Sequence, residues 1–271
     1  MNRTPVVFIH GAWLHALSWE LWAERFAGRG FLALAPGWPG EFGTARDSRA
    51  YPEMLGDTGL EELTDHYASF VRSLDVPPVI IGHSIGGLIA QHLIGADLGQ
   101  AAVAIAPLPI NDVVLPDPQA RHWQAAADIP GGPPVSLSRE RFRDLLANTV
   151  GAEEAAGIFE RYAMPTPRSL LTDLAASGAE RHSRAVADIG NVGRGPLLLI
   201  SGQQDRLVPD SVTRAVYKQY GDSTAVTELK QFADRGHSLV VDGGWRLVAD
   251  YVLGWLNERA VRPTWECPGA R

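Results

Sequence analysis

The sequence has almost no cysteine, little lysine and no long apolar run. Cys267 is the only cysteine among 271 residues, which excludes intrachain disulfides and cysteine-based metal clusters. Lysine occurs only at Lys218 and Lys230 and the formal net charge is −7, so the basic face typical of nucleic-acid binding is missing. The longest apolar stretch, residues 76–96, is broken by glycine and polar residues. It predicts a strand, a turn and a helix rather than a membrane span.

The remaining composition is that of an ordinary soluble globular protein. Hydrophobic residues make up 45% of the chain and charged residues 20%, which excludes disorder for the bulk of the chain. The first residues, MNRTPVVFIHG, enter a strand-like run without the apolar core of a secretory signal. We therefore expect a cytoplasmic protein that binds neither nucleic acid nor membranes. No pattern in the sequence indicates its oligomeric state.

Short apolar runs alternate with longer amphipathic stretches along most of the chain. This alternation predicts an α/β fold, with a mainly parallel sheet and helices on both faces. The first five runs are continuously apolar, as expected of strands buried on both faces, whereas the last is more polar and is expected nearer a sheet edge. The predicted strands are 6–9, 32–35, 78–81, 102–106, 197–201 and 225–232, and the predicted helices are 17–28, 60–74, 85–97, 211–220 (with Asp210 as N-cap) and 245–258.

The alternation stops between residues 107 and 195. Prolines punctuate the first part of this segment, and helical stretches follow at about 138–149, 152–162 and 168–177. A structureless loop of this length is implausible in a compact domain, so we interpret residues 108–190 as a mostly helical insertion. The predicted organisation is a core of residues 1–107 and 191–260, the insertion 108–190, and a peripheral tail of residues 261–271.

The strongest motif is G-x-S-x-G at Gly82, Ser84 and Gly86, between an apolar strand and a helix. A serine on so sharp a turn adopts a strained backbone, and the positions two before and two after it have no room for side chains. The turn lifts the Ser84 hydroxyl clear of the backbone, close to the start of the following helix. We therefore predict that Ser84 is a catalytic nucleophile.

A nucleophilic serine needs a base, and the base needs an acid that orients it. Of the eight histidines, His237 lies between the last strand and the last helix, which places it at the same edge of the sheet as Ser84. Asp205 follows the fifth strand, where catalytic groups of open α/β sheets collect. We predict a triad of Ser84, Asp205 and His237, with Asp112 and Asp234 as weaker rivals of Asp205.

An oxyanion hole requires two backbone N–H groups aimed at one point. One is expected from Ile85, which follows the nucleophile. The other is expected from the loop after the first strand, where we favour Ala12, with Trp13 as the fallback. Gly11 lets the backbone turn tightly there. We expect His10 to brace this loop by hydrogen bonds rather than to act as a base.

Four segments, 7–13, 82–87, 202–209 and 236–237, resemble the α/β-hydrolase superfamily, and the order Ser, Asp, His is the one expected there. The resemblance implies that the insertion is a lid over the active site. It also implies a six-stranded sheet that lacks the family's first two antiparallel strands. The HGAW start is similar to plant methylesterases, hydroxynitrile lyases, and small bacterial esterases and lactonases. The serine nucleophile argues against haloalkane dehalogenases and epoxide hydrolases, which use Asp there.

We expect the chain to be a serine esterase that works without a metal or an organic cofactor. Its expected substrate is a small-to-medium hydrophobic carboxylic ester, lactone or thioester, cleaved through an acyl-enzyme on Ser84. Ligand sites are mostly apolar with a few polar groups, so an apolar pocket is expected. Its predicted lining residues are Trp13, Trp38, Trp123, Phe159 and Met164.

Two classes of alternative stay open. The same triad can serve carbon–carbon bond hydrolysis, cyanohydrin cleavage or perhydrolase chemistry, because fold and triad do not set the substrate. For a hydroxynitrile lyase the resemblance implies a lysine in the cavity, and Lys218 and Lys230 fall outside the predicted pocket. The second class is a non-catalytic receptor built on the same fold, which would acylate once without steady turnover.

Overall fold

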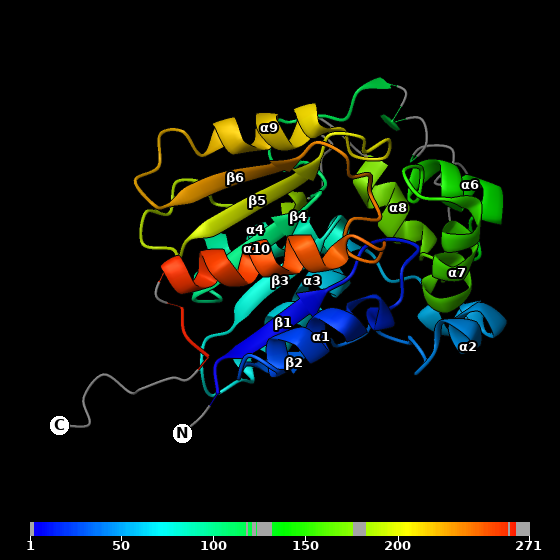
Figure 1. Ribbon diagram of the computed structural model, residues 1–271, viewed down its shortest axis with the longest axis horizontal. Coiled ribbons are helices and arrows are strands. Elements are labelled where there is room, and N and C mark those ends of the chain that lie inside the picture. The colour runs from blue at the N-terminus through cyan, green and yellow to red at the C-terminus, as the bar shows by residue number, and fades with distance from the viewer. Residues whose placement is uncertain are drawn as a thin grey trace.

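Six parallel strands form one sheet at the centre of the protein (Figure 1). The computed structural model describes residues 3–117, 119–120, 123, 132–175, 183–259 and 261–263. The spatial order of the strands is β2-β1-β3-β4-β5-β6, so the direction of winding reverses between β1 and β3. The crevice at such a reversal is where open α/β sheets bind ligands. The strands are β1 (Pro5–Ile9), β2 (Leu32–Leu34), β3 (Val79–His83), β4 (Ala101–Ile105), β5 (Leu197–Gly202) and β6 (Thr227–Phe232).

The predicted strands agree with the observed ones to within two residues at each end, and β6 lies at a sheet edge as expected. The prediction that the second strand is buried on both faces is wrong. β2 has only three residues, and Leu32 is 42% exposed. The physical reason is its position: β2 pairs only with β1 and ends the sheet, so solvent reaches a strand of apolar composition.

Two apolar cores lie on the two faces of the sheet, because successive side chains of a strand point to opposite faces. Phe8 of β1 belongs to the core formed with α1 and α10, whereas its neighbours Val7 and Ile9 belong to the core formed with α3, α4 and α9. The sheet is therefore covered on both sides, as predicted (Figure 1). These helices are α1 (Glu20–Ala27), α3 (Leu60–Arg72), α4 (Ile85–Gly95), α9 (Asp210–Gln219) and α10 (Trp245–Glu258).

Asp210 is the first residue of α9 and not its N-cap, which is Pro209. The Asp210 carboxylate accepts hydrogen bonds from Oγ of Ser201, at 2.5 Å, and from Nε2 of Gln231, at 2.6 Å. The side chain thus joins the ends of β5 and β6 to α9 instead of capping its own helix. Its other oxygen pairs with Arg214, one turn along α9, at 2.8 Å. The sequence prediction failed here because the two hydrogen-bond donors from the strands are distant in sequence.

The segment between β4 and β5 contains helices and no named strand in its described part, and its interpretation as an inserted lid stays a prediction. We call residues 108–190 the insert. Its helices gather beyond the carboxyl ends of the strands (Figure 1). The expected helix 168–177 is described only to Ala175, and its last two residues lie outside the described part. The insert's helices are α6 (Arg139–Leu145), α7 (Ala152–Tyr162), α8 (Arg168–Ala175) and the short η4 (Ser183–Ala185).

Other segments outside the sheet also have defined structure. The loop after β2 contains two short helices that the sequence did not predict, α2 (Ala45–Ala50) and η2 (Pro52–Leu55), and η1 (Ala16–Trp19) precedes α1. At the other end of the chain, the carbonyl of Pro263 accepts a hydrogen bond of 2.8 Å from the N–H of Thr4. The rest of the tail, including Cys267, lies outside the described residues. None of the described helices has both the length and the apolar character needed to cross a membrane.

Candidate active site

Ser84 lies at the turn between β3 and α4, with φ of 56° and ψ of −115°. This left-handed backbone is strained for any residue other than glycine. Two glycines make the turn possible: a Cβ on Gly82 would lie 1.9 Å from the carbonyl oxygen of Gly86, and one on Gly86 would lie 2.1 Å from that of Ile9. The turn in the structure therefore has the steric restriction that the G-x-S-x-G motif predicts.

The loop after β1 passes directly beside Ser84. A Cβ on Gly11 would lie 2.7 Å from Cβ of Ser84 and 3.1 Å from Nδ1 of His83. Glycine is required at position 11 because any side chain would collide with the turn that carries Ser84. The loop and the turn meet at the reversal between β1 and β3, the position at which open α/β sheets generally bind ligands.

His237 and Asp205 form a buried pair at the ends of β6 and β5. Nδ1 of His237 lies 2.7 Å from Oδ2 of Asp205, and their side chains are 1% and 0% exposed. Oδ1 of Asp205 accepts two further hydrogen bonds, from the N–H groups of Leu207 at 2.9 Å and Val208 at 2.8 Å. These bonds fix the carboxylate, so it can orient the imidazole. The rival Asp234 is 75% exposed on its side chain, and Asp112 is also exposed.

His83 holds the loop of His237 against the turn of Ser84, a role that the sequence analysis missed. Its Nε2 donates a hydrogen bond of 2.9 Å to the carbonyl oxygen of His237, and the two rings lie 4.6 Å apart. Burial, together with the nearby His237, holds the pKa of His83 well below its ordinary value. The ring is therefore neutral at pH 7 and acts as a hydrogen-bond donor rather than as a charge. The signal available in the sequence was the position of His83 inside the G-x-S-x-G motif.

The hydroxyl of Ser84 is buried, and Oγ forms no hydrogen bond with any described residue. The structure thus brings Asp205 and His237 into contact and links His237 to the Ser84 turn through His83, but it contains no direct bond from Ser84 to His237. Catalytic hydrogen bonds are often long without substrate and shorten when substrate binds. The triad role of Ser84 stays a prediction.

The loop after β1 distinguishes between the two candidates for the second oxyanion donor. The N–H of Trp13, the fallback candidate, already donates a hydrogen bond of 2.8 Å to Oγ1 of Thr166. It is therefore not free to bind an oxyanion. The N–H of Ala12 forms no hydrogen bond within the described part of the chain. Ile85 is the first residue of α4, whose N–H has no acceptor within the helix. The geometry therefore favours Ala12 and Ile85, whose role in catalysis stays a prediction.

A buried carboxylate, Glu41, supports the same loop from the core side. Its Oε2 lies 2.9 Å from Nε2 of His10 and its Oε1 lies 3.1 Å from Nε2 of His15. Burial alone would raise the pKa of Glu41, but the charge of His10, the charge of His15 and the N–H of Ala16 outweigh it and lower the pKa to about 2. His10 thus contacts the loop and its support, as expected of a bracing residue. No motif pointed to Glu41.

Of the five residues predicted to line a pocket, four are buried and Phe159 is partly buried, and they do not lie in one place. Trp13, Phe159 and Met164 line a small cavity of about 10 Å³ together with Arg49, room for about one water molecule. Trp123 contacts this group, because its ring lies 5.1 Å from that of Trp13. Trp38 is elsewhere: its ring stacks on His10 at 4.5 Å, beneath the loop after β1. A substrate-binding role for these residues stays a prediction.

Among the hydrogen bonds that join the insert to the rest of the protein, three reach the loops that carry Asp205, His237 and Ala12. In the first, Nδ2 of Asn148 donates to the carbonyl oxygen of Gln204, next to Asp205, at 2.9 Å. In the second, Oε1 of Glu154 accepts from the N–H of Gly243, in the loop after His237, at 2.6 Å. The third is the bond from Trp13 to Thr166 described above. We call these three bonds the insert ties.

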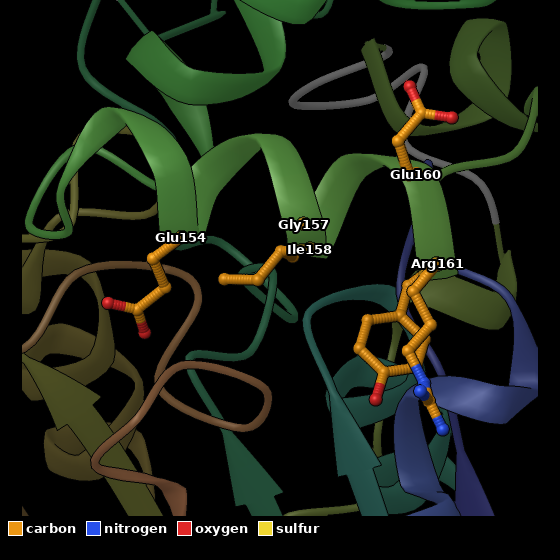
Figure 2. A pocket seen from close by; sticks show the side chains of 6 residues that line it. Glu154, Gly157, Ile158, Glu160 and Arg161 are labelled. Atoms are coloured by element: carbon orange, nitrogen blue, oxygen red, sulfur yellow. The ribbon is translucent and has the colours of Figure 1, made fainter.

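An open groove of about 580 Å³ lies along α7 (Figure 2). Glu154 and Ile158 point to the same side of the helix in this view, whereas Glu160 points to the opposite side. None of the predicted site residues lines this groove. It is therefore separate from the candidate active site. Among the described residues, no group of three or more His, Cys, Asp or Glu side chains could hold a metal ion.

A family model described as "Alpha/beta hydrolase family" matches residues 6–251. No protein with curated function matches the sequence. Among solved structures, a monoacylglycerol lipase from Paleococcus ferrophilus is 21% identical, with a TM-score of 0.67 and 94% of each chain covered.

Two further structures have the same fold at lower identity. A methylesterase from Arabidopsis is 17% identical, with a TM-score of 0.65, covering 94% of this chain and 99% of that one. A pyrethroid hydrolase, PytH, is also 17% identical, with a TM-score of 0.66, covering 96% and 99%. At these identities the likeness concerns the fold.

Proposed function

Because the chain belongs to the alpha/beta hydrolase family, we propose that it is a serine hydrolase acting on a small-to-medium hydrophobic carboxylic ester, lactone or thioester. The reaction passes through an acyl-enzyme on Ser84. The observation that carries the proposal is the buried contact of 2.7 Å between His237 and Asp205, at the end of the sheet that also carries the Ser84 turn. The similar structures are those of a lipase, a methylesterase and a pyrethroid hydrolase, and this supports an ester substrate.

The first chemical step is attack of Ser84 Oγ on the acyl carbon. His237 takes the hydroxyl proton on Nε2, while Asp205 at Nδ1 keeps the ring in the required tautomer and stabilises its charged form. The two N–H groups of Leu207 and Val208 keep the Asp205 carboxylate in place during this change of charge. The ester oxygen then leaves as the alcohol after receiving the proton from His237.

The oxyanion formed during attack is stabilised by the N–H groups of Ile85 and Ala12. Each donor is worth roughly a hundred-fold or more in rate. In the second half of the cycle, His237 removes a proton from a water molecule, which attacks the acyl carbon of the acyl-enzyme. The acid is released and the Ser84 hydroxyl is restored, so the reaction consumes one ester and one water.

The experiment is rapid-mixing measurement of p-nitrophenol release from p-nitrophenyl butyrate by the wild type and by Ser84→Ala. A burst that depends on Ser84, followed by steady turnover, is the expected result. A burst without turnover would point to a non-catalytic receptor. If there is no burst, labelling with a fluorophosphonate tests Ser84 independently of the size of the ester, and an unlabelled wild type would contradict the proposal.

Among the alternatives that use the same triad, a hydroxynitrile lyase is disfavoured by the positions of the lysines. The ammonium group of Lys230 lies 4.9 Å from the ring centre of Tyr251 and 5.2 Å from that of Phe232. Lys218 is exposed near the end of α9. Carbon–carbon bond hydrolysis and perhydrolase chemistry are tested by product analysis with the matching substrates.

A further inference from the structure

The loop after β1 forms a short antiparallel contact with the insert. The N–H of Trp13 donates to Oγ1 of Thr166 at 2.8 Å, and the carbonyl of Trp13 accepts from the N–H of Met164 at 3.3 Å. Leu14 and Ala163 form an isolated antiparallel bridge. Residues of the insert, more than a hundred positions away in the sequence, thus hold one side of the loop after β1, which carries the candidate oxyanion donor Ala12.

Thr166 is itself fixed in place. Its side chain is fully buried, and its backbone exchanges two hydrogen bonds with Val135, at 2.8 and 3.0 Å. Nε1 of Trp13 donates to the carbonyl of the same Val135, at 3.1 Å. The hydroxyl of Thr166 is therefore an acceptor in a defined position, and the indole of Trp13 is held independently of it.

Trp13 has a φ of 59°, a backbone conformation that bulky residues rarely adopt. Such a conformation persists only where the surroundings impose it. The Thr166 hydroxyl supplies one such constraint, because it pairs a buried N–H that would otherwise lack a partner. The N–H of Trp13 lies in the peptide plane that joins Ala12 to Trp13, so this hydrogen bond fixes that plane. The Ala12 N–H lies in the preceding peptide plane of the same turn, and its direction therefore depends on how the turn is held.

We propose that Thr166 is a positioning residue for the oxyanion hole. Its hydroxyl engages the N–H of Trp13, holds the loop after β1 in its left-handed turn, and so leaves the N–H of Ala12 directed at the reacting carbonyl. Thr166 does not touch the substrate; it acts through the loop. The inference rests on the proposed function, because it assigns a part in stabilising the oxyanion of that reaction.

The test compares Thr166→Val, which removes the hydroxyl, with Thr166→Ser, which keeps it. Thr213→Val is the matched control, because Thr213 is another fully buried threonine whose hydroxyl has no partner among the described residues. The readouts are the acylation rate constant, KM, and the affinity for a trifluoromethyl ketone, whose adduct places an oxyanion in the hole. Circular dichroism melting checks that each variant is folded.

The expected result is an acylation rate lowered about 10- to 100-fold in Thr166→Val. KM is expected to stay within about two-fold, and the inhibitor affinity is expected to fall by the same factor as the rate. Thr166→Ser and Thr213→Val are expected to resemble the wild type. Should Thr166→Val fail to fold because a methyl group needs more than 2.8 Å from a nitrogen, Thr166→Ala removes the hydroxyl without adding an atom there.

A folded, hydroxyl-free variant with wild-type acylation would overturn the inference. Equal losses in Thr166→Val and Thr166→Ser, or a rise in KM alone, would also overturn it, since they indicate a packing or substrate-binding role. These outcomes differ from failure of the proposed function, which is a wild type that neither shows a burst nor takes a fluorophosphonate label on Ser84. That result would remove both proposals together.

Discussion

Oδ2 of Asp205 lies 2.7 Å from Nδ1 of His237, while the other oxygen of the same carboxylate accepts hydrogen bonds from two backbone N–H groups. Both oxygens of the carboxylate are thus engaged, in three contacts. An amide in its place can supply only one acceptor oxygen. Replacing the carboxylate with an amide is therefore expected to affect the tautomer of His237 and the loop after β5. These two effects can be measured separately.

Asp205→Asn is expected to lower kcat by about 10⁴-fold, because the amide no longer stabilises the charged imidazole or selects its tautomer. The rate of steady ester hydrolysis measures this effect. Asp234→Asn and Asp112→Asn are the controls, because both carboxylates are exposed, and both variants should keep nearly full activity. A larger loss in either control than in Asp205→Asn would reassign the acid.

Ser84→Gly is expected to be inactive and yet more stable than Ser84→Ala. Both variants remove the hydroxyl, but only glycine relieves the strained backbone at φ of 56°. Relief of such strain is worth about 1–3 kcal/mol, offset by about 0.5–1 kcal/mol from the greater freedom of glycine in the unfolded chain. Thermal melting of the two variants tests this, and a Ser84→Gly protein that melts below Ser84→Ala would contradict it.

Gly86→Ala is expected to cost about 3 kcal/mol or more of folding stability, because its Cβ would lie 2.1 Å from the carbonyl oxygen of Ile9. Gly157→Ala is the matched control in the middle of α7, where nothing lies within 4 Å of the added Cβ (Figure 2). Alanine there should stabilise the protein by about 0.5–1 kcal/mol. Urea unfolding curves compare the two. Similar effects of both changes would refute the steric account of the Ser84 turn.

Glu41→Gln is expected to destabilise the protein at neutral pH by about 1–3 kcal/mol, because an amide has one acceptor oxygen where the carboxylate contacts His10, His15 and the N–H of Ala16 with two. The pKa of Glu41 is lower in the folded state, so the stabilisation is complete above about pH 4.5 and is lost as the pH falls toward 2. The stability difference between wild type and variant should therefore shrink across that interval. A difference that stays constant from pH 7 to pH 2 would show that packing, not charge, is responsible.

The sequence predicted most of the fold because its signals are local. Strands buried on both faces read as continuous apolar runs, and the helices carry apolar side chains at helical spacing. The exposure of Leu32 was missed because the order of strands in a sheet depends on pairing between distant segments. Composition alone cannot distinguish an apolar edge strand from a central one.

The candidate site was predictable where a residue's place follows from the end of a strand, and not where it follows from tertiary contacts. Asp205 and His237 each follow a strand of the same parallel sheet, so their meeting could be foreseen. Thr166 is 153 positions from Trp13, and no motif joins them. Glu41 lies in a glycine- and proline-rich loop that gave no hint of a buried charge.

The insert ties limit how this protein can exchange parts with its relatives. A graft that replaced the insert with that of another hydrolase would remove the partners of Gln204, Gly243 and Trp13 at once. A transplanted insert would confer its own substrate preference only if it also supplied an amide, a carboxylate and a hydroxyl at the positions of Asn148, Glu154 and Thr166. If the proposed function holds, these three bonds couple substrate range to catalytic competence.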